Sequence, residues 1–157
     1  MNTLRLATLV AFIGCAGTTS AYAQDFRGFV GTGVTSDVNG QHFPGFSGGA
    51  VVDLGQPWVS AGAQAETFFS WPYFAGRGSV FAQGNLFPKG KVRPFVLGGF
   101  GWGEEGGTLI GAGMEFRPGE TGLGLRASIE DYVVRYQGYD RARTGHQVAL
   151  RVGFLFR

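Results

Sequence analysis

Two histidines are the residues of this 157-residue chain best suited to acid–base or metal chemistry. His42 and His146 are far apart in the sequence, and Asp37, Asp131 and Asp140 are the carboxylates nearest to them. An imidazole beside a carboxylate can carry a proton, and three or more such side chains can hold a metal ion. Their spacing matches no recognised motif, and histidines in polar connecting segments are usually solvated. We therefore predict no catalytic residue, no metal site and no cofactor.

Five further charged residues lie in segments where apolar residues occupy every second position: Glu66, Glu115, Arg126, Glu130 and Arg151. Both signs of charge are present. Because a buried charge without a partner is very costly, an enclosed face would require these side chains to pair. We predict that they form an interior ionic network. The alternative is that they are surface charges of a soluble barrel whose apolar residues face inward.

The composition limits the kind of chain that positions these residues. There are 29 glycines and 15 phenylalanines, charged residues make up 15%, and the formal net charge is +2. This charge, without a basic run, gives no electrostatic case for nucleic-acid binding. The chain has one cysteine, so it cannot form an internal disulfide. We expect a closed sheet or a bilayer to stabilise it instead.

Residues 1–23 have the features of a secretory signal peptide. Arg5 supplies a positive charge, residues 6–13 are apolar, and Ala21-Tyr22-Ala23 fits a cleavage site, so we expect the mature chain to begin at Gln24. Phe12-Ile13-Gly14-Cys15 offers an alternative, a lipobox whose cysteine would be lipidated. Both interpretations predict an exported protein.

The rest of the chain alternates with a period of two. No apolar run after residue 23 approaches the roughly 20 residues of a transmembrane helix. In the last segment Val148, Leu150 and Phe154 share one face, and Arg151 lies on the other. The period is broken at Asp131, where we expect a bulge or the bilayer edge. The clear segments are 59–67, 110–117, 123–133 and 146–157; weaker ones are 26–34, 46–53, 79–87 and 92–102, the last two with ambiguous facing.

Eight segments of about 9–11 residues fit strands that cross a bilayer at a tilt. The connections between them alternate in length, as expected of a barrel with both termini in the periplasm. Short connections are at 54–57, 88–91 and 118–121, and longer ones at 35–45, 70–76, 103–107 and 137–145. We predict an all-β fold over residues 24–157, an eight-stranded antiparallel up-and-down transmembrane β-barrel. Its interior should be filled by side chains, with glycines making room for large neighbours.

The segment Lys91-Val92-Arg93-Pro94-Phe95, with the glycine-rich residues 96–103, resembles a strand of the small outer-membrane β-barrel proteins, which include OmpA-like, OmpX-like and opacity-type porin-family barrels. Residues 111–116 and 152–156 are similar to that family's sixth and last strands. Arg157 departs from the aromatic residue on which such chains typically end. The resemblance implies a monomer in the outer membrane of a Gram-negative cell envelope. Its partners would be outer-membrane lipid, lipopolysaccharide and, during insertion, the barrel-assembly machinery.

Aromatic residues flank the predicted span and are expected to form a girdle at the membrane interfaces. An ordinary enrichment of aromatics in strands is the alternative. The residues are Trp58, Trp71, Tyr73, Trp102, Tyr132 and Tyr136.

These observations favour a non-enzymatic outer-membrane barrel with a structural or surface-interaction role. The connections 35–45 and 137–145 are its expected contact surfaces for lipopolysaccharide or a host surface. Two alternatives stay open. One is an exported soluble barrel that binds a small apolar ligand. The other is an outer-membrane lipid-modifying barrel enzyme, for which the fold alone would be the argument.

Overall fold

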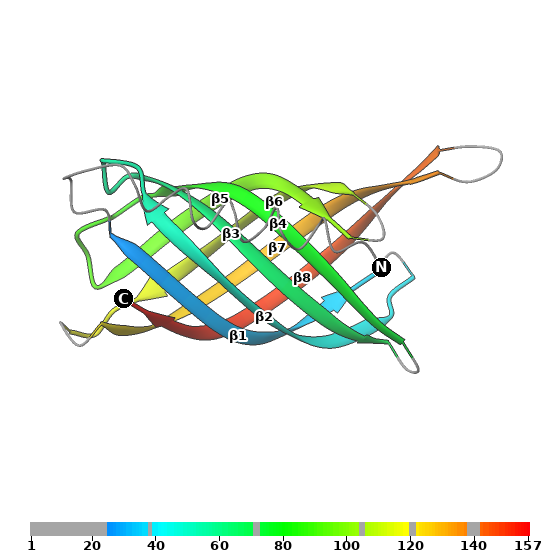
Figure 1. Ribbon diagram of the computed structural model, residues 1–157, viewed down its shortest axis with the longest axis horizontal. Coiled ribbons are helices and arrows are strands. Elements are labelled where there is room, and N and C mark those ends of the chain that lie inside the picture. The colour runs from blue at the N-terminus through cyan, green and yellow to red at the C-terminus, as the bar shows by residue number, and fades with distance from the viewer. Residues whose placement is uncertain (1–24, 38, 71–72, 104–105, 120–121, 138–141) are drawn as a thin grey trace, which may run out of the picture.

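A computed structural model describes residues 25–37, 39–70, 73–103, 106–119, 122–137 and 142–157. Eight antiparallel strands follow one another in chain order around a single closed barrel (Figure 1). They are β1 (Phe26–Ser36), β2 (His42–Asp53), β3 (Val59–Ser70), β4 (Tyr73–Asn85), β5 (Val92–Trp102), β6 (Gly107–Phe116), β7 (Leu123–Gln137) and β8 (Ala142–Phe156). This is the predicted fold class. The predicted signal peptide, residues 1–23, lies outside the described residues, which contain no helix long and apolar enough to cross a membrane.

The barrel closes between its first and last strands. β1 pairs with β8 from Gly28 opposite Phe156 to Ser36 opposite Val148. Closure gives the backbone groups at the free edges of β1 and β8 a partner, so the sheet has no open edge along this seam. We call the end where β1 begins and β8 ends the termini end, and the other the opposite end.

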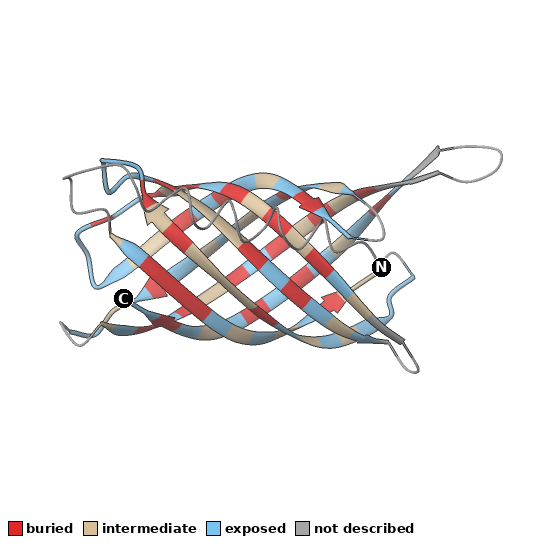
Figure 2. Cartoon of the chain, viewed as in Figure 1, coloured by how far each residue is buried: buried red, intermediate tan, exposed pale blue. Residues whose placement is uncertain are grey.

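Burial alternates along each strand (Figure 2). In β8, for example, Leu150, Val152 and Phe154 are about 60% exposed, at 58%, 60% and 64%, whereas Arg151 and Leu155 are buried. The outward positions are therefore the apolar ones, as the period of two predicted. The interpretation in which the charged face lies outside is wrong.

The two strands of ambiguous facing, β4 and β5, have large apolar residues on the inner face. Phe81, Phe95 and Leu97 are buried inside the barrel. On β5, Val96 and Phe100 point outward. β5 has large apolar residues on both faces, and β4 places Phe81 among inward polar residues, so polarity in the predicted segments could not assign their direction.

Inward glycines make room for these large side chains, as predicted. A Cβ built on Gly113 would lie 2.5 Å from the Cζ atom of Phe95, its direct partner in the β5–β6 register. Two other ring–glycine partners repeat the arrangement, Phe29 with Gly49 and Phe81 with Gly62. The high glycine content therefore fits the narrow interior of an eight-stranded barrel.

The predicted alternation of long and short connections is wrong. β1 continues to Ser36 and β2 begins at His42, so most of the predicted 35–45 connection is strand. β7 and β8 are 15 residues each and pair up to Gln137 opposite Ala142, extending beyond their neighbours (Figure 1). Main-chain pairing does not require apolar side chains, so the strands run on into polar sequence. Asp131 stays in register with Ile110 and Val148, without a bulge.

Candidate functional site

The described interior contains equal numbers of opposite charges. Both sets are buried, so the barrel core is polar and close to neutral. The cations are Arg27, Arg77, Arg126 and Arg151, and the anions are Asp53, Glu66, Glu115 and Glu130. The five residues predicted for an interior network are among them.

The larger ionic cluster lies midway along the barrel. Arg151 on β8 donates to Glu66 on β3 and to Glu130 on β7. Arg77 donates to the same Glu66, and the Gln64 amide donates to Glu130 Oε2 at 2.7 Å. Each carboxylate thus receives more than one donor, the condition under which a buried charge is tolerated.

Glu115 is the centre of a second cluster, nearer the termini end. Its Oε1 atom accepts a hydrogen bond from Arg126 at 2.6 Å, and its Oε2 atom accepts one from Arg117 at 2.7 Å. Arg126 also donates to Gln83 at 2.9 Å, and its guanidinium carbon lies 4.1 Å from the centre of the Phe95 ring. The stacked ring and two polar partners fix this guanidinium in place.

Arg27 forms a third group with residues that the sequence reasoning missed. Its guanidinium lies 2.8 Å from Asp53, which also accepts a hydrogen bond from Ser60 at 2.7 Å. Asn85 donates to Ser60 at 2.9 Å. Arg27 and Asp53 stand at the ends of weakly alternating segments. Continuing the alternation of inward and outward positions to both ends of each strand would have placed Arg27 and Asp53 on the inner face.

Arg77 was missed because it falls just before the predicted 79–87 segment. It is two residues from Ser79 and four from Phe81, which both face inward, so it is in phase with them. The strand begins at Tyr73, earlier than its polar sequence suggested.

Tyr132 was predicted at the membrane interface, and this is wrong. Its side chain is 1% exposed and lies inside the barrel, where the hydroxyl accepts a hydrogen bond from Gln64 at 2.8 Å and donates to Glu130 at 3.3 Å. Tyr132 is two residues from Glu130 and therefore on the same face of β7. It belongs to the interior network.

Two of the other aromatics point outward. Trp58 is 53% exposed at the termini end, and Trp102 is 43% exposed where β5 ends at the opposite end. Trp71 and the side chains of Tyr73 and Tyr136 lie outside what the structure describes. The girdle itself stays a prediction, with one described tryptophan at each end of the span.

The histidines form two separate pairs on the outer face. His146 Nδ1 lies 2.8 Å from Asp131 Oδ2, and His42 Nδ1 lies 2.8 Å from Ser36 Oγ. Closure brings their strands close, as expected, but in the register Val148 stands between Ser36 of one pair and Asp131 of the other. Within the described ranges, no group of three His, Cys, Asp or Glu side chains could hold a metal ion.

Gly45-Phe46-Ser47-Gly48-Gly49 matches the Gly-x-Ser-x-Gly pattern of serine hydrolases, a match that the sequence reasoning overlooked. That pattern requires the serine to stand on a sharp turn between a strand and a helix. Ser47 is instead buried on the inner face in the middle of β2. The local structure therefore lacks the exposed elbow that the pattern needs.

The interior side chains leave little free space. One cavity is lined by Ser47, Glu66 and Arg151, and a second by Gln64, Arg126 and Glu130; each has a volume of about 10 Å³. Such a volume accommodates about one water molecule. These cavities are too small and too polar for an apolar ligand.

Arg157 adds an ionic contact at the seam. Its Nε atom lies 2.8 Å from Asp25 Oδ1, next to the start of β1, and its backbone N–H donates to the Gly122 carbonyl at 3.0 Å. The residue that departs from the terminal-aromatic pattern thus links β8 to both neighbouring strands.

A closed eight-stranded barrel with an apolar outer face and a filled ionic interior is the architecture of small transmembrane β-barrels. No protein-family model matches the sequence, and no curated protein matches it in sequence.

Solved structures provide the fold comparison. The N-terminal β-barrel domain of OprF from Pseudomonas aeruginosa is 18% identical, with a TM-score of 0.57 over 85% of this chain and 98% of that one. Neisserial surface protein A is 8% identical, with a TM-score of 0.64 over 88% and 99%. A de novo designed barrel, TMB2.3, is 15% identical, with a TM-score of 0.58 over 85% and 94%. The chain has the fold of the small eight-stranded outer-membrane β-barrels.

Proposed function

We propose that this chain is an outer-membrane β-barrel protein with a structural or surface-interaction role and no catalytic activity. The observation that carries the proposal is the apolar outer face combined with a charged interior. Among the described side chains, exposed large apolar residues occur on seven of the eight strands, including Phe46, Ile110, Ile129 and Phe154. In water this face would be a very large apolar patch, whereas a bilayer is its natural solvent. The outer-membrane fold of the solved neighbours supports the choice of membrane.

The orientation of the proposed protein follows from strand number and from the extended β7–β8 hairpin. Eight strands return the chain to the side from which it began, and outer-membrane barrels carry their longer extensions on the extracellular side, which here is the side of that hairpin. We place the termini end in the periplasm. The opposite end, with the extended β7–β8 hairpin, then faces the cell exterior.

We propose the β7–β8 hairpin and the 37–41 turn as the surfaces that contact lipopolysaccharide or another cell. The hairpin extends past the last β6 partner, Gly107 opposite Val134, and past the last β1 partner, Ser36 opposite Val148. Its end is therefore held away from the rest of the sheet, where a large ligand has access.

Expression of the full chain in a Gram-negative host tests the proposal. We expect the protein in the outer-membrane fraction, resistant to alkaline extraction and solubilised only by detergent. An unboiled sample should migrate differently on a denaturing gel from a boiled one. Recovery of a folded protein in buffer without detergent would overturn the membrane assignment. A change in lipid A mass on overexpression would overturn the proposal that the protein has no catalytic activity.

A further inference from the structure

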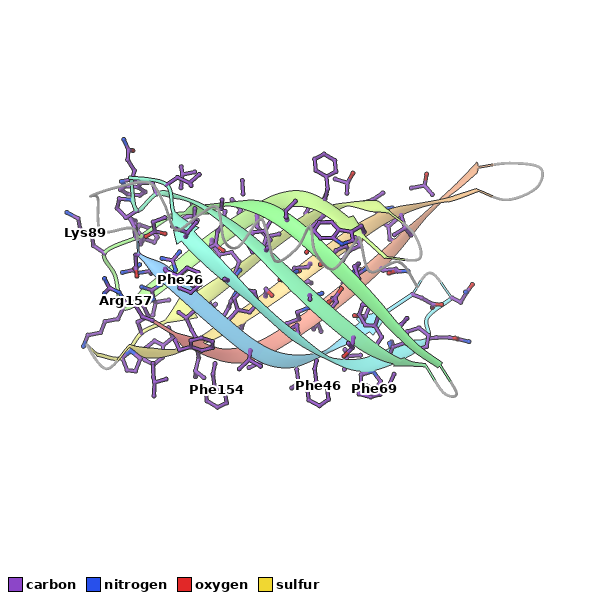
Figure 3. The ribbon with its side chains drawn as sticks, viewed as in Figure 1. Phe26, Phe46, Phe69, Lys89, Phe154 and Arg157 are labelled. Carbon is purple, nitrogen blue, oxygen red and sulfur yellow. The ribbon has the colours of Figure 1, made fainter. Side chains whose placement is uncertain are left out.

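The termini end carries an unbalanced set of cations, which we call the basic rim: Lys89, Lys91, Arg93, Arg117 and Arg157. Lys89 and Lys91, the only lysines of the chain, are both exposed in the turn between β4 and β5. Figure 3 shows Lys89 and Arg157 at the same end as Phe26. Deeper in the barrel, Arg27 and Arg126 are already balanced by Asp53 and Glu115.

Few carboxylates are available to neutralise the basic rim. Asp25 contacts Arg117 at 3.4 Å and Arg157 at 2.8 Å. Glu120 is in the same region of the sequence but lies outside the described residues. Arg117 also pairs with Glu115, so Lys89, Lys91 and Arg93 are the members of the basic rim without an ion pair among the described residues. The segments at the opposite end have the reverse bias: Asp37, Glu104, Glu105, Asp131 and Asp140 against Arg135, Arg141 and Arg143.

Arg93 and Lys91 are the least compensated members of the basic rim. Glu115 stands opposite Arg93 in the β5–β6 register, but its carboxylate is engaged by Arg126 and Arg117. Among the described residues Arg93 has no ion pair, and its Nε atom donates to the Gly90 carbonyl at 3.3 Å. The Lys91 carbonyl accepts the Arg117 N–H at 2.7 Å, which holds these two cationic residues side by side.

Exposed apolar side chains flank Lys89 and Lys91 on the outer face, whereas Arg93 has the inward phase of Phe95 and Leu97. Phe87 is 65% exposed and Leu86 is 51% exposed in the same turn, and Val92 is 47% exposed at the start of β5. Cationic side chains next to apolar and aromatic ones are typical of the boundary between acyl chains and headgroups. The charge of the two lysines is therefore placed where a lipid phosphate would meet it.

We propose that the basic rim binds the phosphate groups of anionic phospholipids in the leaflet around the termini end. The inference rests on the proposed function, since it requires the barrel to span a bilayer. Lysine and arginine side chains near a membrane surface attract anionic headgroups, and the attraction falls with ionic strength.

Trp58 reports on this end of the barrel. Its carbonyl accepts the Asn85 N–H at 2.8 Å, next to the turn that carries both lysines. A protein with Trp71→Phe and Trp102→Phe leaves Trp58 as the sole tryptophan. In vesicles of phosphatidylcholine and phosphatidylglycerol, quenching by each lipid in brominated form gives the relative binding of the two lipids. We expect a preference of roughly fivefold for phosphatidylglycerol at low salt, reduced at high salt.

Variants separate the basic rim from general effects. Lys89→Gln/Lys91→Gln should remove the preference, and Lys89→Arg/Lys91→Arg should keep it. A protein that retains only Trp102, at the opposite end, should show no preference. Circular dichroism and gel mobility before and after boiling establish that each variant is folded.

The remaining outcomes are also decisive. Equal quenching of Trp58 by both lipids, or an equal preference at Trp102, overturns the proposal. Loss of the preference in 10 mM inorganic phosphate, at constant ionic strength, would assign the basic rim to free phosphate instead of lipid. If brominated phosphatidylcholine fails to quench either tryptophan, the protein is outside the bilayer and the proposed function itself is wrong.

Discussion

Glu115 and Arg126 are direct partners in the β6–β7 register, and their side chains meet inside the barrel at 2.6 Å. Glu115 is 0% exposed and Arg126 is 4% exposed. The pair joins adjacent strands at the level where Arg126 also stacks on Phe95. A direct cross-strand contact between opposite charges reinforces the register that the backbone hydrogen bonds define.

Breaking this pair should cost more than replacing it. We expect Glu115→Gln alone to lower the free energy of unfolding by about 3–5 kcal/mol, because Arg126 and Arg117 lose their buried carboxylate. In Glu115→Gln/Arg126→Met the loss should be smaller than the sum of the two single losses. Urea unfolding in lipid vesicles measures all three variants. Additive losses would show that the two side chains do not interact.

The Tyr132 hydroxyl should stabilise the fold from within. Tyr132→Phe is expected to lower the free energy of unfolding by about 1–3 kcal/mol, because Gln64 and Glu130 lose a buried partner. Thr32→Val is the matched control, since it removes a hydroxyl from the outer face. The same unfolding experiment should find it close to wild type. Equal effects of the two substitutions would contradict the interior position of Tyr132.

Gly113 should not tolerate a methyl group. In Gly113→Ala the new Cβ would lie 2.3 Å from the Ala127 carbonyl oxygen and 2.5 Å from Phe95 Cζ, so the strand or the ring must move. We expect a loss of about 1–3 kcal/mol in unfolding free energy. Gly98→Ala, on the outer face of β5 with its nearest neighbour at 3.9 Å, is the control and should lose less. A larger loss in the control than in Gly113→Ala would contradict the packing.

Trp58 and Trp102 should both lie at headgroup depth. In single-tryptophan proteins, bromine near the headgroup end of a lipid chain should quench each residue more strongly than bromine near the terminal methyl. Depth-dependent quenching measures this directly. Stronger quenching from the chain end would place the tryptophan near the bilayer centre and contradict the predicted girdle.

The 37–41 turn should respond to acid. Desolvation acts to raise the pKa of Asp37, but the N–H groups of Gln41 and Asn39, donated to its carboxylate, outweigh it and hold that pKa below its ordinary value. A lowered pKa in the folded state means that the stabilisation is present above the unfolded pKa, near 3.9, and is lost as the pH falls through the folded value.

Hydrogen exchange of the Gln41 amide should therefore quicken, relative to an unstructured amide, below about pH 4. Asp37→Asn keeps an acceptor oxygen without a titrating charge and is the control. Its Gln41 amide should show no such change. Persistence of the acid response in Asp37→Asn would assign it to another group.

Much of the fold could be predicted from sequence, because the side of the sheet to which a strand residue points is a local property. The period of two that places Val152 and Phe154 on one face and Arg151 on the other is a consequence of strand geometry, wherever the strand lies. The same rule places Tyr132 on the inner face with Glu130. The prediction of Tyr132 at the membrane interface was wrong because it relied on the preference of tyrosine for interfaces and not on the position of this residue in the alternation. Strand ends were harder, because main-chain pairing continues into polar segments such as 35–36 and 142–145.

The partners of the interior charges were decided by the tertiary structure alone. The sequence predicted that Glu66, Glu130 and Arg151 face inward and need partners, and it contains no signal that Arg151 lies between the two carboxylates. Glu66 is on β3 and Arg151 on β8, strands that are not adjacent in the sheet. Their meeting depends on closure of the sheet and on the stagger of all eight strands, which set the interior positions that face one another. Alternation gives the direction of each side chain, and only the closed barrel gives its neighbour.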